Sequence, residues 1–197
     1  MFKIVQISEP YKVIPKEFQN FEILLKCDYS ESHSKSHFLY LTDEVKEQIF
    51  THISWKKTTS NNIVEQGGIL LGNTYYDEEK CITFGIVEKA ISGKSAIGSP
   101  GYLEMNHQTW KEMIDEVDLL LNDNKNLNLQ IIGWYHTHPN SLGVFMSGTD
   151  RNTQKNMFGN IWQFAIVLNP HRQIWRVFYG SNSEECKGAF FNSKPLK

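Results

Sequence analysis

The stretch LQIIGWYHTHPNSLGVFMSGTD, residues 129–150, joins a continuous apolar strand to two histidines and then to the start of a short helix. Because side chains alternate across a strand, His136 and His138 project to the same side where this strand ends. Two imidazoles on one side are a natural pair of metal ligands, and Asp150 is a candidate third ligand. Three protein ligands and one water molecule are the coordination typical of a catalytic zinc site.

Each part of this stretch also has a purely structural interpretation. A His-x-His pair is more often a polar strand end than a metal site. The segment from Ser147 to Asp150 fits a helix N-cap with an acidic residue three positions on, a variant of the capping box. The two interpretations of Ser147 are compatible, because a hydroxyl at the start of a helix can also face a substrate.

A second informative stretch, VEQGGILLG, covers residues 64–72. Glu65 stands immediately before a glycine-rich apolar strand, where burial makes an ionised carboxylate costly. Taken by itself, Glu65 would more often be a surface residue at the edge of a loop. Beside a zinc-activated water it would instead serve as a general base, taking a proton and passing it to a leaving amine.

The composition is that of a folded chain: 197 residues, 40% hydrophobic, with 5 Trp, 8 Tyr and 12 Phe. A formal net charge of −2 argues against a basic nucleic-acid-binding protein, and the abundant aromatic residues argue against a disordered one. No apolar run is long enough to span a membrane, and the first residues lack the apolar core of a secretory signal. Cys27, Cys81 and Cys186 form no C-x-x-C pair, so we expect reduced thiols in a cytoplasmic protein.

We expect a mixed α/β fold, with a mixed sheet flanked by helices. The chain divides into an N-terminal extension (1–36), a main body (37–183) and a C-terminal tail (184–197). The extension contains two β-prone pieces, near Phe2–Ile7 and Phe21–Cys27, and ends in a polar, serine-rich segment.

Within the body, apolar periodicity predicts helices and strands in imperfect alternation. One helix begins after Thr42 as its N-cap, and a short one begins near Ser147 or Gly148. A longer helix from Asn106 should present six apolar residues on one face: Trp110, Met113, Ile114, Val117, Leu120 and Leu121. Strands are expected at Phe38–Leu41, Gly68–Thr74, Cys81–Ile91, Leu129–Tyr135, Ile161–Leu168 and Ile174–Tyr179.

The arrangement resembles the JAMM (MPN+) metalloprotease family, which includes the deubiquitinase of the proteasome lid and bacterial JAB-domain isopeptidases. The family pattern is a glutamate ahead of a small-apolar strand, then His-Ser/Thr-His-Pro, and after a spacer Ser-x-x-Asp. Here these elements are Glu65, residues 136–139 and residues 147–150. The resemblance spans roughly residues 38–180 and implies a single MPN/JAB-type catalytic domain in the main body.

The spacer between the second histidine and the serine is one residue longer here than is usual in the family. It runs from Pro139 to Met146. Because loops tolerate insertions, we expect the additional residue to bow out between Asn140 and Val144 and to leave Ser147 in register.

The resemblance implies a zinc isopeptidase that hydrolyses the bond following the C-terminal tail of ubiquitin or a ubiquitin-like protein. In that scheme His136, His138 and Asp150 hold one Zn²⁺ per chain, which polarises the scissile carbonyl and lowers the pKa of its water. Glu65 accepts the proton of that water, and Ser147 donates a hydrogen bond to the developing oxyanion.

The segment Ala90–Met105 is placed like the first insertion of the family and is expected to border the groove for the tail, which could add there as an extra strand. Small tail residues would be needed to pass between this segment and the zinc. Trp134, beside the ligands, is expected to serve core packing.

The implied partners are ubiquitin or a ubiquitin-like protein with its conjugates, and activating and conjugating enzymes of the same operon. Neither nucleic acid nor a membrane is expected. The compact body favours a bacterial conjugation system, with antiphage defence as one setting, over a eukaryotic-type deubiquitinase. A non-catalytic MPN scaffold is the alternative from another class, although such subunits lack the ligands that this chain keeps. A zinc nucleobase deaminase is excluded, because the H-x-E…P-C-x-x-C pattern is absent.

Overall fold

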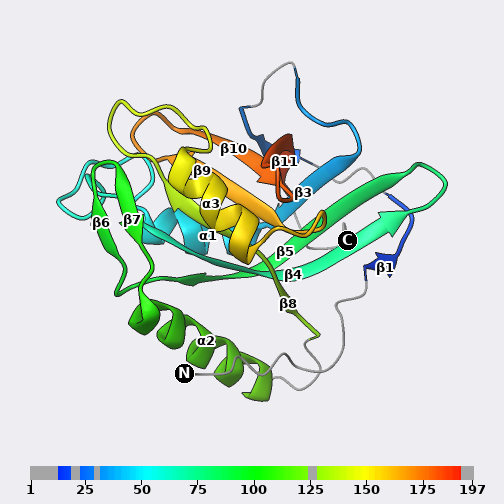
Figure 1. Cartoon of the computed structure of the whole chain (residues 1–197), viewed down its shortest axis with the longest axis horizontal. Coiled ribbons are helices and arrows are strands. Elements are labelled where there is room, and N and C mark those ends of the chain that lie inside the picture. Colours follow the sequence, from blue (N-terminus) through cyan, green and yellow to red (C-terminus); the bar gives the residue numbers. More distant parts are fainter. Residues whose placement is uncertain (1–12, 19–22, 29–31, 124–127, 192–197) are drawn as a thin grey trace.

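The computed structural model describes residues 13–18, 23–28, 32–123 and 128–191. Its elements follow in the order β1 (Ile14–Pro15), β2 (Ile23–Lys26), β3 (His37–Thr42), α1 (Asp43–His52), β4 (Gly67–Asp77), β5 (Ile82–Ser92), β6 (Ile97–Ser99), β7 (Tyr102–Glu104), α2 (His107–Asp123), β8 (Gln130–Thr137), α3 (Gly148–Met157), β9 (Phe164–Asn169), β10 (Ile174–Tyr179) and β11 (Glu184–Phe191). The cartoon in Figure 1 shows their arrangement.

One large sheet carries the fold. Its strands run in the order β1-β4-β5-β3-β11-β10-β9-β8, with β2 paired to β11. Strand β8, at the end of this order, also pairs with β4. The strands from β4 through β5 to β8 therefore form a closed circuit. Pairs β3–β5, β3–β11 and β8–β9 are parallel, whereas β4–β5, β4–β8, β9–β10 and β10–β11 are antiparallel. The expected mixed α/β architecture is confirmed.

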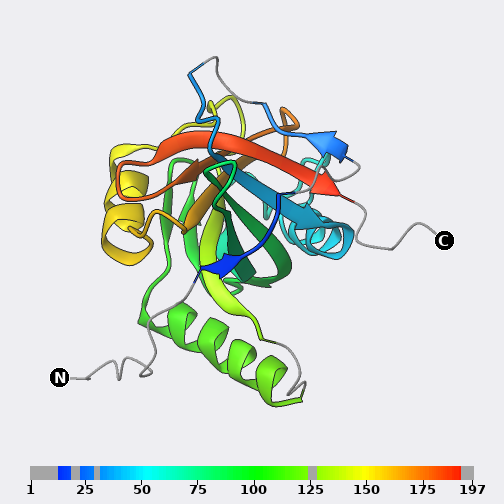
Figure 2. The same cartoon turned by 90° about the vertical axis from the view of Figure 1, so that its right-hand side faces the viewer.

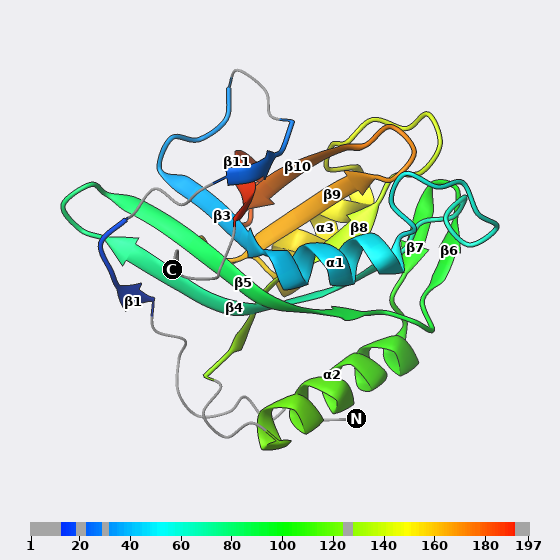
Figure 3. The same cartoon turned by 180° about the vertical axis from the view of Figure 1, so that it is seen from behind.

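The helices lie on both sides of this sheet. Helix α1 is on one side and α3 on the other, as Figures 2 and 3 show. As expected, α1 begins after Thr42, whose Oγ1 accepts a hydrogen bond from the N–H of Val45. Buried Val45 and Ile49 of α1 join one core cluster, while Met113 of α2 and Phe158 after α3 belong to a second. Among the described residues, no helix combines the length and apolar character needed to cross a membrane.

The apolar face of α2 is narrower than the sequence predicts. Met113 and Val117 are buried, and three of the other expected residues pack half-buried against the second cluster. Ile114 is 37% exposed and does not belong to that face. Successive helical residues differ by about 100° in direction, and Ile114 is turned away from the direction in which Met113 and Val117 point.

Some strand boundaries differ from the expected ones, and β4 extends to Asp77, three residues beyond the expected end at Thr74. Strand β9 begins at Phe164 rather than at Ile161, because residues 160–163 form a hydrogen-bonded turn that leaves Ile161 64% exposed. Strand β2 falls within the expected piece Phe21–Cys27, whereas the expected strand Phe2–Ile7 lies outside the described residues.

The prediction that residues 184–197 form a C-terminal tail is wrong for residues 184–191. Residues 184–191 form β11, which lies between β3 and β10 in the main sheet and carries the fully buried Cys186 and Phe190. Glycine and charged residues between the apolar ones hid the alternation that marks a half-buried strand. The N-terminal region also joins the sheet, through β1 beside β4 and β2 beside β11.

Truncation tests the role of β11. A chain that ends at Ser183 should lose cooperative thermal unfolding, because β3 and β10 then lose their shared neighbour and the core loses Phe190. A chain that ends at Phe191 keeps every described strand and should melt close to the full-length protein. Circular dichroism during heating measures both. Equal melting temperatures for the two truncated chains would show that β11 is dispensable.

Candidate metal centre

The end of β8 places both histidines of the His-Thr-His segment on one side. His136 is the penultimate residue of β8 and His138 follows the strand, held by its N–H bond to the carbonyl oxygen of Leu168 at 2.8 Å. Thr137, between them, faces the other way, and its Oγ1 accepts the N–H of Gln66 at 2.9 Å. The alternation expected from the sequence therefore brings the two imidazoles together.

Asp150 completes a compact donor cluster. Its Oδ1 lies 3.2 Å from Nε2 of His136 and its Oδ2 lies 3.4 Å from Nε2 of His138. The two Nε2 atoms are 3.2 Å apart, and all three side chains are buried. The donor atoms lie within 4.8 Å of one another, so a single ion could contact all three residues.

The helix start holds Asp150 in place. The N–H of Ser147 donates to Asp150 Oδ2 at 2.7 Å, and the N–H of Asp150 donates to Ser147 Oγ at 3.2 Å. These two bonds form a capping box at the N-terminus of α3, as the sequence predicts. The Asp150 carboxylate that closes the capping box is therefore also the candidate ligand. The longer spacer leaves Ser147 and Asp150 beside the histidines.

Contacts of the other ring atoms fix the orientation of each imidazole. Nδ1 of His138 lies 2.8 Å from the carbonyl oxygen of Gly143, to which it must donate, so Nε2 is the ring nitrogen that faces the cluster. His136 stacks on Trp134, with ring centroids 4.5 Å apart. Trp134 in turn donates from Nε1 to Oε1 of Gln154 on α3, at 2.7 Å. Trp134 is core, as expected, but it also positions a candidate ligand.

Nδ1 of His136 is buried and has no hydrogen-bond partner among the described residues. The stacked indole, rather than a hydrogen bond, therefore sets the angle of this ring.

The pairing of β4 with β8 brings Glu65 to the cluster. Gly67 pairs with His136, so two residues further along the antiparallel register Glu65 stands opposite His138. Oε1 of Glu65 lies 3.9 Å from Nε2 of His138, and the residue is only 5% exposed. Its N–H donates to the carbonyl oxygen of Ser99 on β6 at 2.8 Å. The alternative interpretation of Glu65, a surface residue at a loop edge, is wrong.

Burial and mutual contact shift the pKa values of this cluster. Burial raises the pKa of Glu65 to about 7, with Asp150 adding to the effect and His138 opposing it. Burial also lowers the pKa of His136. Burial acts to lower the pKa of His138, but the hydrogen bonds with Asp150 and Gly143 and the nearby carboxylate charges together raise it. Burial works against the charge of Asp150 as well, yet hydrogen bonds with both histidines hold its pKa well below its usual range.

The donor set fits a zinc ion. Two imidazole nitrogens and one carboxylate oxygen are a ligand set of catalytic zinc, which keeps further positions open. The anionic Asp150 presents negative potential beside the Nε2 atoms of both histidines, and a divalent cation would neutralise it.

A cavity of about 90 Å³ opens beside the cluster. Its lining includes Glu65, Ser147 and Asp150, together with Tyr102 and Leu103 of the β6–β7 hairpin. The segment Ala90–Met105 thus borders the site, and it does so as an ordered hairpin. Its close packing needs Gly98, where an added Cβ would lie 2.1 Å from the carbonyl oxygen of Glu65. Tyr102 carried no sequence signal, because it reaches the site only through the fold.

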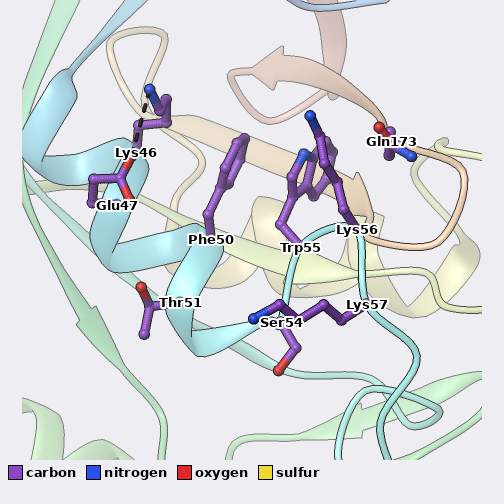
Figure 4. A pocket seen from close by; sticks show the side chains of 9 residues that line it. All are labelled: Lys46, Glu47, Phe50, Thr51, Ser54, Trp55, Lys56, Lys57 and Gln173. Carbon is purple, nitrogen blue, oxygen red and sulfur yellow. Dashed lines mark ion pairs between the residues drawn. The ribbon is translucent and has the colours of Figure 1, made fainter.

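A larger cavity, of about 550 Å³, lies beside α1 and is drawn in Figure 4. Its lining contains lysines, the stacked pair Phe50 and Trp55, and Glu47, which pairs with Lys46. It has neither histidine nor cysteine among its lining residues, and so it offers no comparable metal donors. The chemistry is therefore placed at the smaller cavity.

The family described as JAB1/Mov34/MPN/PAD-1 ubiquitin protease matches residues 34–159, more than half of the chain. The chain therefore belongs to this family, and the resemblance found in the sequence is confirmed. The matched region contains the histidine pair, Glu65, Ser147 and Asp150. Comparison with curated proteins gave no match.

Metal content tests the donor cluster. Purified protein should carry about one zinc ion per chain, because its three donors converge on one point. Replacing both His136 and His138 by alanine should abolish zinc uptake, while circular dichroism shows the native secondary structure. Elemental analysis measures the metal. Zinc retained by the double variant would mean that other residues bind it.

Proposed function

We propose that this protein is a zinc-dependent isopeptidase or peptidase that cleaves after the C-terminal tail of ubiquitin or a ubiquitin-like protein. The observation that carries the proposal is the buried Glu65 carboxylate, 3.9 Å from a ligand of the His-His-Asp cluster and on the wall of the same cavity as Ser147. A metal site that served only structure would have no use for a buried acid at its edge.

His136, His138 and Asp150 would hold the zinc ion. When bound, zinc supplies Lewis acidity, which polarises a scissile carbonyl and makes a water molecule acidic near neutral pH. The stacked Trp134 and the Gly143 carbonyl hold the two imidazoles at fixed angles, so little reorganisation is needed when the ion binds.

Glu65 is suited to move the proton. A carboxylate with a pKa of about 7 takes a proton from a nucleophilic water at Oε1 and can give it up again to a leaving amine at the same pH. Its burial excludes bulk water from the transfer. The hydrogen bond from its N–H to Ser99 fixes the main chain at Glu65 against the hairpin that borders the cavity.

Ser147 is suited to stabilise the oxyanion. Its Oγ accepts the N–H of Asp150, and the residue lines the adjoining cavity, where the hydroxyl could turn toward a substrate oxygen. A hydroxyl donor held by a helix cap is preorganised for negative charge that develops on the substrate oxygen. The cap uses a lone pair of Oγ as acceptor, whereas the proposed catalytic role uses the O–H as donor.

The substrate tail is proposed to run along the β6–β7 hairpin, where backbone hydrogen bonds could add it as a strand. The cavity between Tyr102 of the hairpin and the cluster is small, about 90 Å³, and a tail of small residues would fit it best. This constraint favours a tail such as that of ubiquitin-like proteins over a general peptide substrate.

We place the protein in the cytoplasm of a bacterium, with activating and conjugating enzymes of a ubiquitin-like system as partners and antiphage defence as one setting. A eukaryotic-type deubiquitinase is the second setting. A scaffold without catalysis is disfavoured because the three donors lie within 4.8 Å of one another and because Glu65 and Asp150 line the same cavity.

Glu65→Gln separates binding from chemistry. The variant should keep zinc and bind the ubiquitin-like partner with unchanged affinity, yet turn over on the order of 10²-fold more slowly, because an amide cannot accept the proton. Glu79→Gln, in the exposed turn between β4 and β5, is the matched control and should retain full turnover. Near-normal cleavage by Glu65→Gln would assign the general base to another residue.

Ser147→Ala distinguishes the two roles of this hydroxyl. If Ser147 is an oxyanion donor, its replacement by alanine should slow cleavage by ~10²–10³-fold while zinc is retained. If Ser147 is only a helix cap, its replacement should lower the free energy of unfolding by about 1 kcal/mol and change the activity little. Turnover and melting temperature, both measured on the one variant, decide between them. We expect the loss of turnover.

A further inference from the structure

We propose that His171 is a positioning residue for the metal ligand His138, acting through the loop of residues 139–143. The inference rests on the proposed function, because it concerns the same metal site. His171 lies in the turn between β9 and β10 and does not touch the donor cluster. It acts by fixing the backbone to which His138 is hydrogen-bonded.

The orientation of His138 depends on a loop rather than on a strand or helix. The Gly143 carbonyl, which accepts from Nδ1 of His138 at 2.8 Å, belongs to the segment between β8 and α3. Within this loop, Asn140 has φ = 58°, a left-handed conformation that asparagine tolerates better than most residues. The loop therefore needs contacts from outside to stay in one conformation.

One clamp comes from Asn169, fully buried at the end of β9. Its Nδ2 donates to the carbonyl oxygens of Asn140 at 3.0 Å and Leu142 at 2.8 Å. Its Oδ1 accepts the N–H groups of His171 at 3.0 Å and Arg172 at 2.8 Å. Asn169 thus ties the loop directly to the turn that carries His171.

His171 supplies the second clamp. The N–H of Asn140 donates to Nδ1 of His171 at 2.8 Å, and Nε2 of His171 lies 3.1 Å from Oδ1 of Asn62. A backbone N–H can only donate, so Nδ1 must accept and the proton of the ring must sit on Nε2. The ring is then neutral and donates to Asn62.

Asn62 confirms this tautomer from the other side. Its Oδ1 also accepts the N–H of Thr59 at 2.8 Å, while its Nδ2 donates to three carbonyl oxygens. Two of those carbonyls belong to Ser54 and Lys57, which line the large cavity of Figure 4. The amide is oriented by these four contacts, and so only a ring that donates from Nε2 fits it.

The same loop residue also reaches the segment ahead of Glu65. Nδ2 of Asn140 donates to the carbonyl oxygen of Ile63 at 3.2 Å. Asn140 therefore links the loop that orients a ligand to the segment that precedes the proposed general base. The N–H bond of Asn140 to His171 holds this residue together with the bonds to Asn169 and Ile63.

Two isosteric replacements test the inference. The amide of asparagine ends near the position of Nδ1, so His171→Asn can still accept from Asn140; that of glutamine ends near Nε2, so His171→Gln can bond only to Asn62. We expect His171→Gln to weaken zinc binding roughly tenfold and His171→Asn to stay close to the wild type. His33→Gln, in the segment before β3, is the control histidine replacement.

Zinc affinity is measured by competition with a chromophoric chelator, and the melting temperature of the metal-free protein is measured alongside. A loss of affinity in His171→Gln without a matching loss in His171→Asn supports the positioning role. Equal affinities for both variants and the wild type overturn it, and so does an equal loss in both, which would mean that Nδ1 is not the atom that matters. If the wild type itself takes up no zinc, the proposed metal site fails and the inference fails with it.

Discussion

The pairing of β8 with β4 on one side and β9 on the other is the constraint on which the site depends. This double pairing fixes the register of the strand that ends in the two histidines. A slip of one residue would turn both imidazoles to the other face and move Glu65 away from His138. The pairing of β8 with β4 also closes the circuit of strands around the core. The same register therefore serves both the site and the core.

The start of α3 adds the remaining chemistry through a single local motif. The capping box satisfies backbone N–H groups and at the same time holds the Asp150 carboxylate at the cluster. A second carboxylate, Glu65, is then brought close to the first, and burial raises its pKa. The two acids end with different protonation behaviour because one is hydrogen-bonded to both histidines and the other is not.

Around this centre, residues from distant parts of the sequence supply support. The indole of Trp134 and the carbonyl of Gly143 orient the two imidazoles, and the β6–β7 hairpin limits the cavity. Polar side chains at the end of β9 hold the loop that contains Gly143. Packing and hydrogen bonds from several separate elements thus hold a small set of donors in place, as in a preorganised centre.

The sequence by itself determined the mixed α/β class, the caps of α1 and α3 and the candidate donors His136, His138 and Asp150. These features depend on short-range patterns: alternation along a strand, and a polar residue three positions before its partner at a helix start. Tertiary structure alone decided that residues 184–191 form a central strand, that Trp134 stacks on His136 and that Asn169 clamps the loop after β8. Strand β11 pairs with β3, which lies far away in the sequence, and such contacts leave no local period to detect.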